Sequence, residues 1–150
     1  MISPGEPAPQ FTLRREDGNA FTPEDLQGKT TVLVFYPFAF SPVCTDQFNL
    51  YEEVLDDLKA RGATLYGVSC DATWSQKAFR EKLGVTIEQL SDFEPKGETC
   101  RAFGVLHPGG FPQRALVLVG PDRIVRWSHQ APSPGDLPGA NLIFDALDGS

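Results

Sequence analysis

The chain has 150 residues, of which 41% are hydrophobic and 22% charged, and this ordinary globular composition excludes a low-complexity or disordered chain. The length predicts one domain over residues 1–150. The formal net charge of −7 argues against a nucleic-acid partner, and the absence of a long apolar run argues against a membrane span.

The N-terminal residues and the cysteines indicate the cellular compartment and whether a metal or another cofactor is expected. The N-terminal residues lack the basic and apolar regions of a signal peptide. Cys44, Cys70 and Cys100 form an odd and widely spaced set, unlike a secreted disulfide framework, so a cytoplasmic location is expected. There is no Cys-x-x-Cys pair and the two histidines are not close together in the sequence, so we expect neither a metal nor another cofactor.

The first predicted elements lead to a strand and a long helix. Alternating apolar and polar residues predict a short hairpin with strands at 11–13 and 20–22, followed by a capped helical turn at 22–26. The contiguous apolar residues of 31–36 predict a buried strand. Apolar residues at helical spacing then predict one helix from Ser41 to about Arg61, which Gly62 ends.

The rest of the chain continues in the same alternation. A strand at 63–69 completes a β-α-β unit. The further predicted elements are a helix at 74–83, a short strand at 89–91, a helix at 98–103, a loop at 107–112, a hairpin with strands at 114–119 and 124–128, and a helix at 141–147. This order predicts an α/β fold, a three-layer sandwich of thioredoxin type with an additional N-terminal β-hairpin.

A cysteine occupies the first turn of the long predicted helix. Ser41 suits the N-cap and Pro42 the first helical position, which makes Cys44 the third residue of the helix. Unpaired backbone N–H groups at this end favour a thiolate over a thiol. The plainer alternative is that Cys44 is a small buried apolar residue, as most free cysteines are. The Ser-Pro-x-Cys start favours a nucleophile.

The motif around this cysteine also carries a family resemblance. Pro37-x-x-x-Ser41-x-x-Cys44 resembles the peroxiredoxin motif Pro-x-x-x-Thr/Ser-x-x-Cys. The resemblance extends over nearly the whole chain and is strongest to the branch of bacterioferritin-comigratory and single-cysteine alkyl hydroperoxidase proteins. It includes the opening Gly5-x-Pro7-Ala8-Pro9-x-Phe11, the strand end Gly67-Val68-Ser69 and the pair Arg114-Ala115.

The resemblance implies a thiol-dependent peroxidase for hydrogen peroxide and organic hydroperoxides. Cys44 would attack the peroxide and become a sulfenic acid. Ser41 would hydrogen-bond the peroxide, and Pro37 would form a wall of the pocket. Arg114 would approach Cys44 from the neighbouring strand and stabilise negative charge. The backbone N–H groups of Val43 and Cys44 would complete an anion-binding cradle.

Four further side chains are expected around the substrate. Gln47 stands where many relatives carry Glu, and it can still accept a hydrogen bond from Arg114. Phe38, Phe40 and Phe111 are expected at an apolar rim that admits organic hydroperoxides, or in a dimer contact. Both readings remain open, and the resemblance implies a homodimer formed through the loops around the site.

The resolving thiol can come from within the chain or from outside it. Asn49 stands where some relatives hold a resolving cysteine. Cys70 follows a strand on the same sheet edge as Cys44 and is a possible resolving cysteine, or simply a half-buried small residue. Cys100 is expected to serve in packing. We therefore expect an external low-molecular-weight thiol, or a thioredoxin- or glutaredoxin-like protein, to resolve the sulfenic acid.

Two other functions fit the same fold. A thiol–disulfide oxidoreductase typically needs a Cys-x-x-Cys pair, but Ser41 and Gln47 occupy the positions three residues before and after Cys44. A peroxide-sensing redox protein or a non-catalytic binding module would not turn over peroxide.

Overall fold

The computed structural model describes residues 1–149, which build one seven-stranded sheet with the strand order β2-β1-β5-β4-β3-β6-β7. The strands are β1 (Leu13–Arg15), β2 (Ala20–Phe21), β3 (Thr30–Phe35), β4 (Ala63–Ser69), β5 (Glu88–Ser91), β6 (Ala115–Val119) and β7 (Val125–Gln130). The helices are the 3₁₀-helix η1 (Pro23–Leu26) and the α-helices α1 (Pro42–Glu53), α2 (Leu55–Ala60), α3 (Thr73–Leu83), α4 (Glu98–Ala102) and α5 (Ala140–Asp148).

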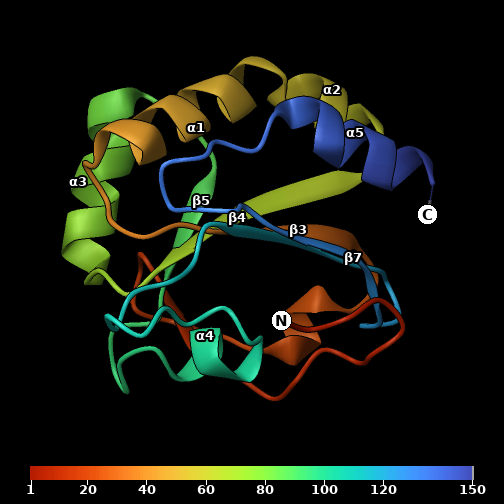
Figure 1. The fold of residues 1–150 in the computed structure, drawn as a ribbon, viewed down its shortest axis with the longest axis horizontal. Helices are drawn as coiled ribbons and strands as arrows, with labels where there is room; N and C mark the ends of the chain where they lie inside the picture. The colour runs from red at the N-terminus through yellow and green to blue at the C-terminus, as the bar shows by residue number, and fades with distance from the viewer. Residues whose placement is uncertain (150) are drawn as a thin grey trace.

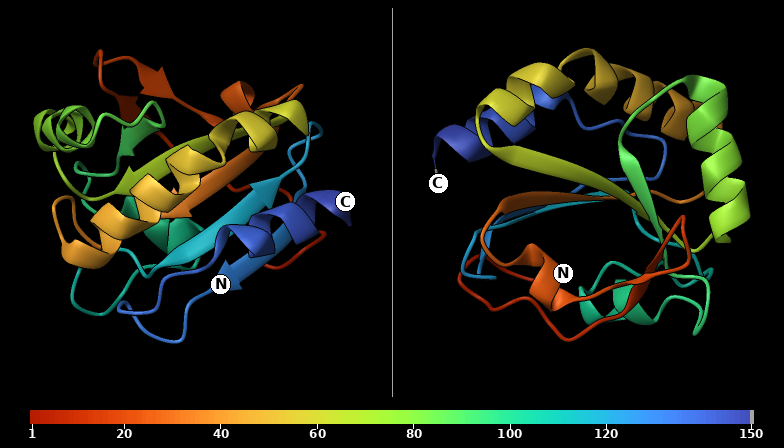
Figure 2. Two further views of the ribbon diagram at one scale, coloured as in Figure 1. Left: turned by 90° about the horizontal axis from the view of Figure 1, so that it is seen from above. Right: turned by 180° about the vertical axis from the view of Figure 1, so that it is seen from behind.

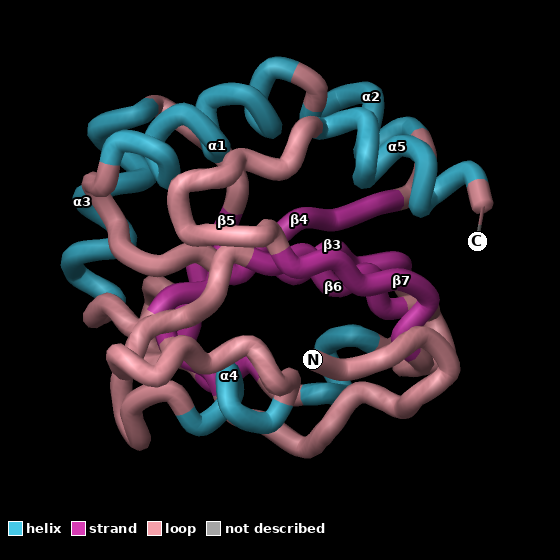
Figure 3. Tube along the Cα trace, in the orientation of Figure 1, coloured by secondary structure: helices cyan, strands magenta, loops and turns pink. Residues whose placement is uncertain are grey.

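Both faces of the sheet are covered. Figures 1 and 2 show α1, α2 and α5 over one face, with α3 beside them, and α4 with the N-terminal segment on the other face. In Figure 3 the strands lie between these two layers. The predicted three-layer α/β sandwich is therefore confirmed. Within residues 1–149, no helix combines the length and the apolar character that crossing a membrane requires.

Strand β3 lies at the centre and divides the interior into two cores. It pairs in parallel with β4 across the α1–α2 crossover and antiparallel with β6, as the predicted β-α-β unit and late hairpin require. Because side chains alternate along a strand, Val32 and Val34 face the core under α1, whereas Leu33 and Phe35 face the core next to α4. We call these the α1-side core and the α4-side core.

The N-terminal hairpin extends the sheet at one edge. Strand β1 pairs antiparallel with β2 and with β5, which confirms the additional hairpin. The predicted helical turn is η1, and its start is held by a reciprocal capping box between Thr22 and Asp25.

The predicted helix from Ser41 to Arg61 is interrupted. Helix α1 ends at Glu53 and α2 begins at Leu55, and the amide of Val54 between them donates to the Tyr51 carbonyl at 3.3 Å. This bond spans three residues instead of four, so it tightens the turn and divides the helix in two. The apolar spacing could not report the break, because both helices keep their apolar faces on the α1-side core.

Candidate active site

Cys44 lies at the N-terminus of α1, after the loop that follows β3. Ser41 is the N-cap residue and Pro42 the first helical residue, so Cys44 is the third residue of the helix as the sequence predicted. The first helical hydrogen bond is donated by the Thr45 amide to the Ser41 carbonyl at 2.9 Å. The amides of Val43 and Cys44 precede that bond and point out of the helix end, where an anion is favoured. The Cys44 side chain is fully buried.

The Ser41 hydroxyl does not cap the helix, which corrects the expectation for its side chain. It donates instead to the Phe38 carbonyl at 3.0 Å. Phe40 adopts a left-handed backbone with φ of 71°, and this turn places the Phe38 carbonyl within reach of Ser41. The hydroxyl is therefore held in the loop that borders the cysteine.

Arg114, the residue before β6, joins this helix end from the neighbouring strand. Its Nη2 donates to the Cys44 sulfur at 3.2 Å. Its Nη1 donates to Oε1 of Gln47 at 2.6 Å, and its Nε donates to the Pro134 carbonyl at 2.7 Å. All three nitrogens of the guanidinium fork are thus engaged, which fixes the plane of the group against the sulfur.

The hydrogen bonds continue beyond Gln47 along one face of α1. Nε2 of Gln47 donates to the Tyr51 hydroxyl at 3.1 Å, and that hydroxyl donates to the Pro138 carbonyl at 2.7 Å. Burial raises the pKa of Tyr51 to about 12, so its proton is retained at neutral pH. Sequence reasoning missed Tyr51, although it follows Gln47 by four residues on the same helix face. The other two acceptors, the carbonyls of Pro134 and Pro138, are backbone groups, so no side-chain pattern in the sequence could have identified them.

The charge of Arg114 has an unusual environment. The side chain is 2% exposed, and within residues 1–149 it forms no ion pair with a carboxylate. Its oxygen partners are a neutral amide and a backbone carbonyl. A buried cation is costly unless a negative charge compensates it. The one remaining partner of the guanidinium fork is the Cys44 sulfur.

A mostly apolar cleft of about 280 Å³ opens beside this arrangement. Its lining residues are Pro37, Phe38, Ser41, Pro42, Val43, Phe111, Arg114, Pro134 and Gly135. The rings of Phe38 and Phe111 lie 5.0 Å apart at one side of it. The structure thus brings Arg114 to the same cleft as Pro37, Ser41 and Val43, which lie close together but far from Arg114 in the sequence.

Two residues expected at the site lie elsewhere. Phe40 does not line the cleft, because its ring packs on Phe79 of α3 at 5.4 Å. Cys70 belongs to the α4-side core, whereas Cys44 belongs to the α1-side core. Alternation along β4 continues from Val68 to Cys70 and turns the thiol away from the face that carries Cys44. In this structure Cys70 is not placed to resolve Cys44.

Known proteins are similar to this chain in sequence and in fold. Residues 4–128 match the model of the AhpC/TSA family. A peroxiredoxin of Thermotoga petrophila is 34% identical over 128 residues, which cover 81% of this chain and 60% of that protein. Alkyl hydroperoxide reductase E of Mycobacterium tuberculosis is 29% identical over 149 residues, covering 98% of this chain and 97% of that protein.

A solved structure extends the likeness to three dimensions. Reduced Prx3 of Vibrio vulnificus in complex with hydrogen peroxide has a TM-score of 0.88 and 27% identity, and the match covers 98% of this chain and 99% of that one. The chain spans 60% of the length of the Thermotoga relative.

Proposed function

This chain belongs to the AhpC/TSA family of peroxiredoxins, and we propose that it is a thiol-dependent peroxidase that reduces hydrogen peroxide and organic hydroperoxides. The observation that carries the proposal is the buried guanidinium of Arg114, which donates to the Cys44 sulfur and has no carboxylate partner within residues 1–149. A cation so placed stabilises a thiolate before the reaction and the charge that develops on oxygen during it.

The first step is attack by the Cys44 thiolate on the nearer oxygen of the peroxide. A sulfur–oxygen bond forms while the oxygen–oxygen bond breaks, which oxidises Cys44 to a sulfenic acid and releases an alkoxide or hydroxide. The leaving oxygen takes up a proton and departs as an alcohol or water. Because both reacting oxygens carry partial negative charge in the transition state, the Arg114 fork and the free amides of Val43 and Cys44 act together.

Other residues of the cleft orient the substrate. Ser41 borders the cleft, and rotation of its hydroxyl from the Phe38 carbonyl allows a hydrogen bond to a peroxide oxygen. Pro37 closes one side and limits water near the sulfur. The apolar rim formed by Phe38 and Phe111 suits the carbon chain of an organic hydroperoxide.

The second half of the cycle comes from outside the site. Neither Cys70 nor Cys100 belongs to the core that holds Cys44, so an external thiol or a thioredoxin- or glutaredoxin-like protein attacks the sulfenic acid, releases water and leaves a mixed disulfide. A second thiol then restores Cys44. The three free cysteines fit a reducing cytoplasm. A homodimer through the exposed rings of Phe38 and Phe40 completes the proposal.

The test is to react the reduced protein with one equivalent of hydrogen peroxide and to trap sulfenic acid with a dione reagent. Trypsin separates the cysteines, because Cys44 falls in residues 30–59, Cys70 in 62–77 and Cys100 in 97–101. We expect the trap on Cys44 and its loss in Cys44→Ser.

The same experiment separates peroxidase from thiol–disulfide exchange. Turnover of peroxide with an added thiol is expected, with no reduction of insulin disulfides in the absence of peroxide. If Cys44 stays unmodified while peroxide oxidises another residue, the proposed function is wrong.

A further inference from the structure

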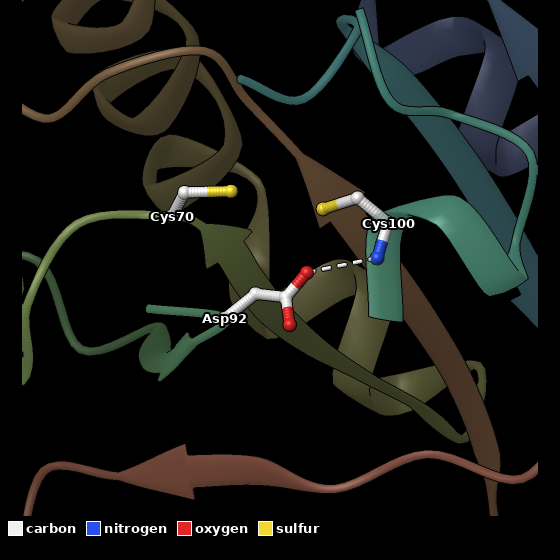
Figure 4. Close-up of side chains that lie close together, drawn as sticks. All are labelled: Cys70, Asp92 and Cys100. Carbon is white, nitrogen blue, oxygen red and sulfur yellow. Dashed lines mark hydrogen bonds between the residues drawn. The ribbon is translucent and has the colours of Figure 1, made fainter. Parts of the chain in front are cut away.

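A second cluster of thiols lies in the α4-side core, apart from Cys44. Cys70 directly follows β4, Cys100 belongs to α4, and Asp92 directly follows β5. The two sulfurs and a carboxylate oxygen of Asp92 all lie within 4.8 Å of one another. Figure 4 shows the sulfurs of Cys70 and Cys100 pointing toward each other. Nothing in the proposed peroxidase cycle uses this cluster.

The carboxylate of Asp92 has a structural task that limits its availability as a ligand. Its two oxygens accept the amides of Thr99 and Cys100 at 3.1 and 2.8 Å, and thereby hold the start of α4. A closed tetrahedral zinc site needs four ligands, and only three candidate ligands gather here within residues 1–149. The two facing thiols are therefore the chemically available pair, and the carboxylate positions one of them.

We propose that Cys70 and Cys100 form a second redox site, a dithiol that hydroperoxides oxidise to an intramolecular disulfide independently of Cys44. The Cys70 sulfur attacks the peroxide, the oxygen–oxygen bond breaks, and an alcohol or water leaves with the thiol proton. The Cys100 sulfur then attacks the Cys70 sulfenic acid, so that a sulfur–sulfur bond forms and the hydroxyl departs as water with the Cys100 proton. One peroxide thus accepts the two electrons of two thiols.

The two cysteines are not equivalent, which assigns the order of the steps. Cys70 is 8% exposed, whereas Cys100 is completely buried, so an oxidant reaches Cys70 first. The hydrogen bond with Cys100 lowers the pKa of Cys70, and the same hydrogen bond together with burial raises the pKa of Cys100. A thiolate is the reactive form, which makes Cys70 the attacking residue and Cys100 the resolving residue.

The disulfide would tie the end of β4 to α4. It would close a loop over residues 70–100, which contains α3 and β5. Cross-linking a loop of this length restricts the unfolded chain, so oxidation is expected to raise the Tm by about 5–10 °C. The pair therefore couples peroxide exposure to the stability of this half of the sheet.

The test uses the full chain with Cys44→Ala, so that the outcome does not depend on the peroxidase reaction. The reduced variant is treated with excess hydrogen peroxide, alkylated under denaturing conditions and digested with trypsin. We expect the two free thiols per chain to disappear and a species two hydrogens lighter to join residues 62–77 to 97–101. The Tm should rise in the same sample and return on reduction.

Matched variants identify the order of attack. In Cys44→Ala/Cys100→Ala, Cys70 should accumulate as a trapped sulfenic acid, whereas in Cys44→Ala/Cys70→Ala the remaining Cys100 should stay reduced. Two alkylatable thiols after peroxide treatment, or a disulfide between two chains, would overturn the proposal even if Cys44 proves fully active in the unaltered protein.

A metal site is the alternative outcome. The reduced Cys44→Ala variant is mixed with one equivalent of Zn²⁺ and passed through a desalting column. Zinc retained at one per chain, with both thiols protected from a disulfide reagent, would show a metal site and overturn the redox pair. We expect zinc to elute separately and both thiols to react once the chain is unfolded.

Discussion

The guanidinium of Arg114 donates a 3.2 Å hydrogen bond to the sulfur of Cys44, a residue 70 positions earlier in the chain. The register of β6 against β3 creates this contact, because Phe35 at the end of β3 pairs with Ala115, the residue after Arg114. The contact joins a fixed positive charge to the free amides at the start of α1. The proposed chemistry depends on the fixed arrangement of the guanidinium N–H donors as much as on the positive charge that they carry.

Arg114→Lys tests whether the three-donor geometry of the guanidinium group is needed. Lysine keeps the charge but replaces three fixed donors with one mobile ammonium, so the bonds to the sulfur, Gln47 and the Pro134 carbonyl cannot all persist. We expect the second-order rate constant with hydrogen peroxide to fall about tenfold to a hundredfold, measured by stopped-flow. Arg126→Lys, at an exposed arginine paired with Asp122, is the control. Equal rates for both variants would remove Arg114 from the mechanism.

Gln47→Ala tests the support behind the arginine. The change leaves a buried guanidinium N–H without its acceptor and removes the amide that donates to the Tyr51 hydroxyl. We expect a loss of about 1–3 kcal/mol in the free energy of unfolding, measured in urea, and a several-fold slower reaction with peroxide. Asn49→Ala on the exposed side of α1 should stay within about 0.5 kcal/mol of the unaltered protein. Similar losses in both variants would contradict the role of the network.

Phe38→Ala tests the apolar rim. Phe38 and Phe40 are equally exposed at 50%, but only Phe38 lines the cleft beside Arg114. Removal of the Phe38 ring should reduce the rate constant for cumene hydroperoxide more than that for hydrogen peroxide, because only the former has a large apolar group to bury. Phe40→Ala should leave the ratio of the two rate constants unchanged. A ratio that shifts with Phe40 but not with Phe38 would refute the assignment of the rim.

Asp92→Asn tests a buried carboxyl group through pH. Burial raises the pKa of Asp92 above that of the unfolded chain, about 3.9. The stability that this shift contributes is therefore complete below about pH 4 and is lost as the pH rises through the folded-state pKa. Asparagine does not titrate, so its free energy of unfolding lacks this pH-dependent loss. The difference in the free energy of unfolding between the variant and the unaltered protein should therefore shift in favour of the variant from pH 4 to pH 7. Urea unfolding at both pH values measures the difference, and a pH-independent difference would contradict the raised pKa.

The sequence by itself determined the parts of the protein that depend on near neighbours along the chain. Pro42, preceded by the extended backbone of Ser41, placed the start of α1, and hence Cys44, because the fixed φ of proline suits the first helical position. The strands and the late hairpin followed from apolar runs and turn residues in the same way. Even the bond between Gln47 and Arg114 was expected, although only from a family resemblance.

Tertiary structure alone decided which distant groups meet. Strand register brought Arg114 to Cys44, and two backbone carbonyls, of Pro134 and Pro138, completed the network without any side-chain pattern to predict them. Alternation along β4 carried Cys70 to the opposite face from Cys44 and toward Cys100. The physical reason is that local propensity acts over a few residues, whereas the face and the partner of a side chain are fixed by how strands pair and layers pack.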